Sequence, residues 1–219
     1  MYGLGRIPQF DEASRAFSLR KLIGDALPPR TTAWDCGLYL NQGQSSSCVG
    51  HGHAHALAAM PYPEPGVAEP TAMQIYNVAQ TLDNIPGTHE GSTVLAGMKA
   101  VQSLYPALQV QYHWCFGIGD MLSALSNVGP VVIGINWYQD MFTPMSNGIV
   151  PVSGDLKGGH CLLATAIDVE NRIVRLHNSW GITWGIGGDC IVHFADLQKL
   201  LSENGEAVVT TTRLIRSLI

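Results

Sequence analysis

Apolar residues recur at helical spacing through the first half of the chain. Between residues 71 and 82, apolar side chains fall close to a period of 3.6, which predicts an amphipathic helix. A second such set predicts a helix over 94–104. Residues 48–60 are rich in alanine and apolar enough to form a buried helix. Gly50 and Gly52 lower its helix propensity, and we expect them to permit the close approach of another element.

The pattern changes after residue 129, where short apolar runs are bounded by Gly, Asn or Asp. Such runs predict buried strands. They cover residues 131–135, 161–168, 173–177, 190–194 and 207–212, with a short helix expected over 195–202. A mostly helical first half and a mostly β second half predict an α+β fold with two lobes. A cleft between two lobes is a common place for a functional site.

Turn residues suggest how the chain is divided. Residues 1–26 read as an irregular N-terminal extension that holds a short helix, and Pro28-Pro29 ends it. We expect one domain over 27–219, with a helical lobe at about 36–128 and a β lobe at about 129–215. Asp120 is a plausible cap for a last helix of the helical lobe.

Composition narrows the class of protein. The chain has 219 residues, of which 46% are hydrophobic and 13% charged, so it is globular and not disordered. Its net charge of −5, without a basic cluster, argues against a nucleic acid partner. No apolar run approaches the roughly 20 residues of a membrane span, and the charged first 25 residues lack a signal peptide. We therefore expect neither a nucleic acid nor a membrane partner.

The cysteines indicate a reducing compartment. They are five in number and sparsely spaced, without a CxxC pair: Cys36, Cys48, Cys115, Cys161 and Cys190. We read them as free thiols of a cytoplasmic protein, although one disulfide stays open. His51, His53 and His55 could suggest a metal, but companion ligands are lacking apart from Cys48. We predict no metal and no cofactor, and expect that helix to pack beneath the site.

Cys48 stands where a polar loop of small residues meets the predicted helix. A thiol there faces unpaired backbone N–H groups and the positive end of the helix dipole, which favour the thiolate. Taken alone, Cys48 is equally well a nucleophile or a small buried core residue. Gln42, six positions earlier, could direct an amide donor to the same place.

Two stretches in the β half supply partners for such a nucleophile. His160 lies between a glycine pair and an apolar strand, and Asn178 ends another strand just before Trp180. His160 would pair with the Cys48 thiol and protonate a leaving amine, and Asn178 would orient its ring. Trp180 would shield that bond from water. Gln42 and the Cys48 backbone N–H would form an oxyanion hole.

These stretches together resemble the papain-like cysteine peptidases. The resemblance rests on Gln42-Gly43 with Cys48, on Gly159-His160, and on Asn-Ser-Trp-Gly followed by Trp-Gly over 178–185. It covers roughly residues 27–215 and implies the two-lobed papain-like fold, a β-barrel-like second lobe and peptide bond hydrolysis through a thioacyl-enzyme. Ser45 and Val49 depart from plant and lysosomal members, and the loop resembles bacterial or phage-type members. A long inhibitory propeptide is not expected.

The resemblance also implies places for a substrate. Gly91 lies where the family pairs its backbone with an extended peptide. Gly134, Gly158 and Gly159 fall where the family lines the pocket for the second residue before the scissile bond. Such small residues predict a roomy pocket that tolerates bulky apolar side chains.

The sequence therefore predicts an enzyme, a cysteine peptidase that acts on peptides or proteins. Two alternatives stay open: a peptidoglycan hydrolase or amidase with the same Cys–His chemistry, and a catalytically silent peptide-binding module. The sequence does not indicate an oligomeric state. Residues 1–26 have two interpretations, a short self-inhibitory strap across the cleft or a segment packed on the back.

Overall fold

A single antiparallel sheet forms the centre of the molecule. The computed structural model describes residues 2–25, 27–87 and 89–212. Within them the strands follow the order β2-β7-β3-β4-β5-β6, and β1 pairs with β4. The strands are β1 (Thr32–Ala33), β2 (Gln111–Trp114), β3 (Val131–Tyr138), β4 (Leu156–Asp168), β5 (Ile173–His177), β6 (Asp189–His193) and β7 (Glu206–Thr211). Every pairing is antiparallel, and β3 on β4 sets Ile135 opposite His160.

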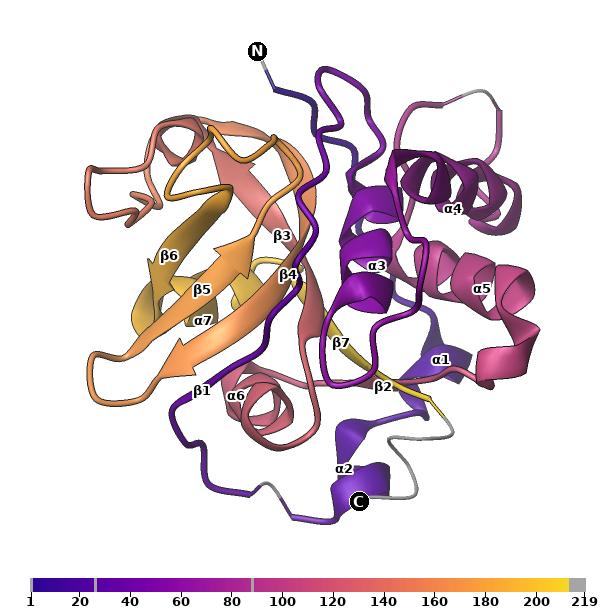
Figure 1. The fold of residues 1–219 in the computed structure, drawn as a ribbon, viewed down its shortest axis with the longest axis horizontal. Helices are drawn as coiled ribbons and strands as arrows, with labels where there is room; N and C mark the ends of the chain where they lie inside the picture. Colours follow the sequence, from indigo (N-terminus) through magenta and orange to yellow (C-terminus); the bar gives the residue numbers. More distant parts are fainter. Residues whose placement is uncertain (1, 26, 88, 213–219) are drawn as a thin grey trace.

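The longer helices gather on one side of this sheet, as Figure 1 shows for α3, α4 and α5. The helices are α1 (Glu12–Arg15), α2 (Leu19–Ile23), α3 (Cys48–Ala58), α4 (Glu69–Leu82), α5 (Val94–Leu104), α6 (Ile118–Asn127) and α7 (Phe194–Ser202). Short 3₁₀ turns are η1 (Pro106–Leu108) and η2 (Gln139–Phe142). Among the described residues, no helix has both the length and the apolar character needed to cross a membrane. The result is the mixed α+β architecture that the sequence predicts.

Two separate clusters of buried side chains lie on either side of the strands β3 and β4. One is formed by α3, α4 and α5 together with Val132, Cys161, Leu163 and Val208. The other holds the remaining inward residues of the sheet with those of α6 and α7. Alternate residues of a strand point to opposite faces, so β3 and β4 serve both clusters. α6, which we assigned to the helical lobe, thus packs with the sheet; the lobe boundary near residue 128 stays a prediction.

The periodic segments become the elements that their patterns predict. The helix expected over 71–82 is α4, and α5 begins after Thr93, whose side chain accepts a hydrogen bond from the Ala96 N–H. The glycines of α3 are positions of close approach. A Cβ on Gly50 would lie 2.2 Å from the Ala72 carbonyl oxygen, and one on Gly52 would lie 2.9 Å from the Cys161 sulfur. α4 and β4 can therefore pack directly against the helix that begins at Cys48.

One local prediction was wrong. Asp120 does not cap α6, which begins at Ile118; its carboxylate binds the Arg20 guanidinium (2.6 Å) and the Phe116 N–H (3.1 Å) instead. Residues 34–40 lie outside the strands: the Trp34 N–H donates to the Thr165 carbonyl of β4 (2.8 Å), whereas the Leu40 N–H donates to His55 Nε2 (3.3 Å). The short strand β1 precedes them.

His177 holds this irregular segment on the β lobe. Its Nδ1 donates to Asp189 Oδ1 (2.6 Å) and its Nε2 donates to the Leu38 carbonyl (2.7 Å). Both ring nitrogens donate only when the imidazole is protonated. Burial alone would lower the pKa of His177, but hydrogen bonds to the side chains of Asp189 and Cys36 outweigh it and raise the pKa to about 10.

We expect the free energy of unfolding to fall as the pH rises above about 6.5, because the folded state keeps the His177 proton that the unfolded state has lost. The stabilisation is complete below the unfolded pKa of about 6.5 and is lost toward pH 10. Between pH 7 and 8.5 the loss should be about 2 kcal/mol, measured by urea unfolding. Asp189→Asn should flatten this slope, and His193→Gln, at an exposed position of β6, should leave it unchanged. A flat profile for the unaltered protein would contradict the prediction.

Candidate active site

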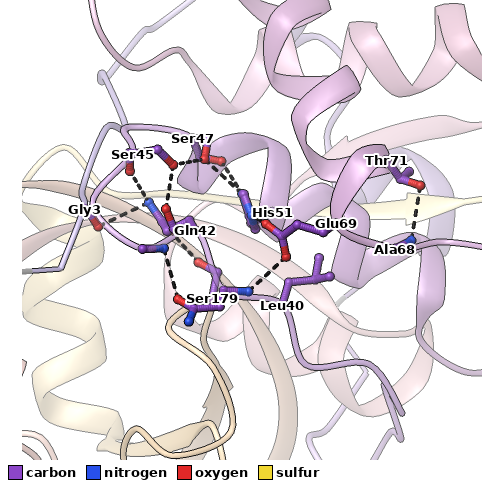
Figure 2. Close-up of polar contacts among 12 residues, drawn as sticks. Gly3, Leu40, Gln42, Ser45, Ser47, His51, Ala68, Glu69, Thr71 and Ser179 are labelled. Carbon is purple, nitrogen blue, oxygen red and sulfur yellow. Dashed lines mark hydrogen bonds and ion pairs between the residues drawn. The ribbon is translucent and has the colours of Figure 1, made fainter.

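The loop before α3 is held by its own hydrogen bonds. The Gln42 carbonyl accepts from the Ser45 N–H (3.1 Å) and the Ser45 hydroxyl (2.8 Å), and Ser45 Oγ lies 2.6 Å from Ser47 Oγ. Figure 2 shows this network around Gln42. Cys48 is the first residue of α3 and is completely buried. All five cysteines are free, so the loop is fixed without a disulfide.

The Gln42 side chain has a defined orientation. Its Oε1 accepts from the Ser179 hydroxyl (2.6 Å), and its backbone N–H donates to the Ser179 carbonyl (2.9 Å). The amide nitrogen Nε2 therefore faces the other way, where it donates to the carbonyl oxygens of Ser45 (2.7 Å) and Gly3 (3.3 Å). The loop before α3 and the chain after β5 thus hold this amide from both lobes.

His160 on β4 and Asn178, directly after β5, form a buried pair. Asn178 Oδ1 lies 2.8 Å from His160 Nε2 and also accepts from the Ser179 N–H, so Nε2 is the protonated nitrogen. Trp180 stacks on the imidazole with ring centres 4.6 Å apart, and Trp137 meets it edge-on at 5.0 Å. His160 Nδ1 is buried and has no hydrogen bond partner among the described residues. A neutral ring in this tautomer keeps an unused acceptor at Nδ1.

The helix that begins at Cys48 packs against β4, the strand that carries His160. The backbone N–H groups of Cys161, Val49 and Arg6 lie at the Cys48 sulfur and lower the pKa of the thiol. Burial outweighs them and raises this pKa to about 12. Burial likewise lowers the pKa of His160 to about 4, although the bond to Asn178 opposes the shift. Both groups are therefore neutral here, contrary to the thiolate expected from the helix N-terminus, because a further segment removes water from the sulfur.

That segment is the N-terminus of the chain, residues 2–7. In Figure 1 it enters from the top, between the sheet and the helices, and passes behind α3. The N–H groups of Gly5 and Arg6 donate to the Gly159 carbonyl (both 3.0 Å). Ser92 exchanges two backbone hydrogen bonds with it, to the Gly5 carbonyl (2.9 Å) and from the Ile7 N–H (2.8 Å). Residues 2–7 therefore lie across the site, as in the interpretation of the N-terminal residues as a strap and not as a segment packed on the back.

The first residues of the segment lie against Gln42 and Trp180. The Gly3 carbonyl accepts from Gln42 Nε2 and from Trp180 Nε1 (3.2 Å), and the Gly3 N–H donates to the Gly43 carbonyl (2.9 Å). Tyr2 also stacks on the Trp180 indole, with ring centres 4.7 Å apart. Trp180 thus contacts both His160 and the covering segment.

The four glycines expected to contact a substrate all lie against residues 4–6 of this segment. A Cβ on Gly91 would lie 2.2 Å from the Gly5 carbonyl oxygen, and one on Gly159 would lie 2.1 Å from the Arg6 carbonyl oxygen. A Cβ on Gly134 would meet Arg6 Nε at 2.9 Å, and one on Gly158 would meet the Leu4 side chain at 3.1 Å. The absence of side chains at these positions makes room for a peptide backbone and for the side chain of Arg6.

Arg6 and Glu206 form a buried ion pair that the sequence did not indicate. Arg6 Nε and Nη2 lie 2.9 and 2.6 Å from Glu206 Oε2, and Nη2 also donates to the Asn204 carbonyl. The two side chains are 0% and 3% exposed. Burial raises the pKa of Glu206 to about 7 against the opposing effect of Arg6. The available signal was Glu206, a carboxylate that opens an otherwise β-branched run.

The three histidines of α3 contact the neighbouring helices and strands. His51 binds the Ser47 carbonyl through Nδ1 (2.9 Å) and Glu69 through Nε2 (2.6 Å), as Figure 2 shows. His53 Nε2 lies 3.0 Å from the Val94 carbonyl. The ring of His55 meets His177 edge-on. They connect α3 to α4, α5 and β5, which fixes the helix that begins at Cys48.

Comparison with known proteins identifies the fold. No family model matches the sequence, and no curated protein matches it significantly. Solved structures do match in fold. Xylellain, a cysteine protease from Xylella fastidiosa, is similar over 96% of both chains with a TM-score of 0.71 and 18% identity. Digestive procathepsin L2 from Tenebrio molitor gives 0.63 over 96% of this chain and 78% of its own, at 18% identity.

Bromelain from Ananas comosus, solved in complex with the E64 inhibitor, gives a TM-score of 0.54 at 15% identity. The match covers 83% of this chain and 94% of bromelain. The expected papain-like fold is therefore confirmed. Identities below 20% show the fold and leave the chemistry to be argued from this chain's own residues.

Proposed function

We propose that the chain is a cysteine peptidase that hydrolyses peptide bonds with Cys48, His160, Asn178 and Gln42. The observation that carries the proposal is the His160–Asn178 pair. Its 2.8 Å bond fixes the proton on Nε2 and leaves Nδ1 as a buried acceptor, on the strand whose next residue faces the Cys48 sulfur. A positioned thiol, base and orienting amide are what nucleophilic acyl transfer needs.

The reaction follows from these positions. His160 Nδ1 takes the proton of the Cys48 thiol, and the sulfur attacks the carbonyl carbon of the scissile bond. The oxyanion receives hydrogen bonds from Gln42 Nε2 and the Cys48 N–H. The imidazolium then gives its proton to the departing amine, which leaves a thioacyl-enzyme. Water activated by His160 hydrolyses that thioester, and the carboxylic acid product and the free thiol are regenerated.

The covering segment must move before a substrate can bind. With the predicted roles, the Gly3 carbonyl occupies the Gln42 donor of the oxyanion hole, and Arg6 fills the pocket for the second residue before the scissile bond. In a substrate the pocket residue precedes the scissile carbonyl, whereas Arg6 follows Gly3. The chain direction of residues 2–7 is therefore the reverse of a substrate's, and none of their peptide bonds takes the place of the scissile bond. The described arrangement is a closed, resting state.

An active-site label tests the proposal. We expect an epoxysuccinyl inhibitor to add once, at Cys48, with peptide mapping to locate the adduct; the Arg6→Ala chain should react faster because its segment has lost an ion pair. Both proteins should cleave a peptide library, and Cys48→Ala should neither react at that site nor cleave. Absence of an adduct at Cys48 in both proteins would contradict the proposal. Release of muropeptides without peptide cleavage would support the wall hydrolase instead.

A further inference from the structure

The pocket lined by Gly134 and Gly159 is filled by a charged side chain. We expected an apolar pocket from the small residues that line it. Its occupant is the Arg6 side chain, whose guanidinium binds one oxygen of Glu206 with two nitrogens, at 2.9 and 2.6 Å. Glu206 is the first residue of β7, directly opposite Gly134 of β3, so the sheet itself fixes its position.

The pair is not saturated. Glu206 Oε1 and Arg6 Nη1 are buried and have no hydrogen bond partner among the described residues. Glu206 also lines a cavity of about 290 Å³, together with Phe10, Trp114 and Phe116. The carboxylate therefore keeps a spare acceptor for a further N–H donor.

An apolar side chain in this pocket would leave Glu206 without an opposite charge, so that the group is buried either as an unpaired carboxylate or in its protonated form. A buried charge is costly unless an opposite charge and hydrogen bonds accompany it. A guanidinium supplies both, since it offers several N–H donors in a fixed plane. The ammonium of a lysine is a more compact donor group and matches a carboxylate less well. The pocket thus discriminates by chemistry rather than by size.

We propose that Glu206 determines the specificity of the site: it selects an arginine side chain at the second residue before the scissile bond, and Arg6 takes that place in the resting chain. This inference rests on the proposed function and replaces the expected preference for bulky apolar residues. The reversed chain direction of residues 2–7 does not affect this inference, because only the Arg6 side chain takes the place of a substrate group. The neighbouring backbone runs the opposite way.

Cleavage by the full-length Arg6→Ala chain tests the proposal, since this variant leaves Glu206 free. Two matched peptide substrates carry arginine or norleucine at the second residue before the scissile bond. We expect kcat/KM to be at least about 10-fold higher for the arginine peptide. The Arg6→Ala/Glu206→Gln double variant should lose or reverse this preference. An equal rate for both peptides, or an arginine preference that survives Glu206→Gln, would overturn the proposal.

A binding measurement separates this inference from the proposed function. In the Cys48→Ala/Arg6→Ala chain, calorimetry with the same two peptides reports recognition without turnover. Tighter binding of the arginine peptide that Glu206→Gln abolishes supports the inference even if the labelling test has failed. Equal binding, or a preference for norleucine, overturns it even if Cys48 proves to be the nucleophile. If Glu206→Gln does not fold, Glu206→Asp, which withdraws the charge by one methylene, should weaken the arginine preference.

Discussion

Replacing Gly5 by alanine should make Cys48 react with iodoacetamide about 5- to 150-fold faster than in the unaltered chain. Gly5 has a φ of +148°, and a Cβ there would lie 2.1 Å from the Ser46 carbonyl oxygen. Backbone cannot yield as a flexible side chain would, so the segment must lift. Overpacking of this kind costs about 1–3 kcal/mol, which changes the ratio of closed to open molecules by about that factor.

Gly5 is the informative position because it belongs to the segment and not to the groove. The change removes no group from the site, so faster alkylation reports the opening of residues 2–7 over the thiol. In the closed state burial raises the pKa of Cys48 to about 12, which keeps it protonated and slow to react. In the open state water and the helix N-terminus act on the sulfur together.

Gly119→Ala provides the matched control for this experiment. Gly119 is exposed on α6, and a Cβ there would have no atom within 4 Å. Its alkylation rate should equal that of the unaltered chain. Alkylation is followed by mass spectrometry with peptide mapping, since four other cysteines are present. If Gly5→Ala reacted no faster than Gly119→Ala, residues 2–7 would not control access to Cys48.

Local periodicity explains why most elements were predictable. The helices α4 and α5 and the strands β3 and β5 carry patterns that a few neighbouring residues define, and their boundaries lie within a few residues of the predictions. The strand β2 was missed because its polar and apolar residues alternate over only four positions, a run too short to stand out from the sequence. It exists because β7 offers it an edge.

The closed arrangement could not be predicted in the same way. Arg6 and Glu206 are 200 positions apart, and neither belongs to a motif. The four small residues Gly91, Gly134, Gly158 and Gly159 indicated a place for a peptide, but they did not indicate that the chain's own N-terminus lies there. The expectation of a lowered thiol pKa failed for the same reason. It considered the dipole of α3, whereas the burial that dominates comes from residues distant in the sequence.

Replacing Gln42 by alanine should reduce kcat for peptide cleavage by about 10²–10³-fold, the usual loss when one oxyanion donor is removed. The structure orients this amide tightly, with Oε1 held by the Ser179 hydroxyl at 2.6 Å and Nε2 directed at the Gly3 carbonyl. That carbonyl oxygen accepts from the amide donor that is proposed to bind the oxyanion. Gln44→Ala is the control, because Gln44 is exposed two residues further along the same loop. It should retain the activity of the unaltered chain.

The same variant makes an opposite prediction for a reaction that has no oxyanion. Alkylation of Cys48 by iodoacetamide forms no tetrahedral intermediate, so it gains nothing from the Gln42 amide. Gln42→Ala also deletes the 3.3 Å bond to Gly3 and loosens residues 2–7, so alkylation should be as fast as in the unaltered chain or faster. Turnover and alkylation should therefore diverge. A parallel loss of both would mean that Gln42 only supports the loop before α3, and unchanged turnover would exclude it from the oxyanion hole.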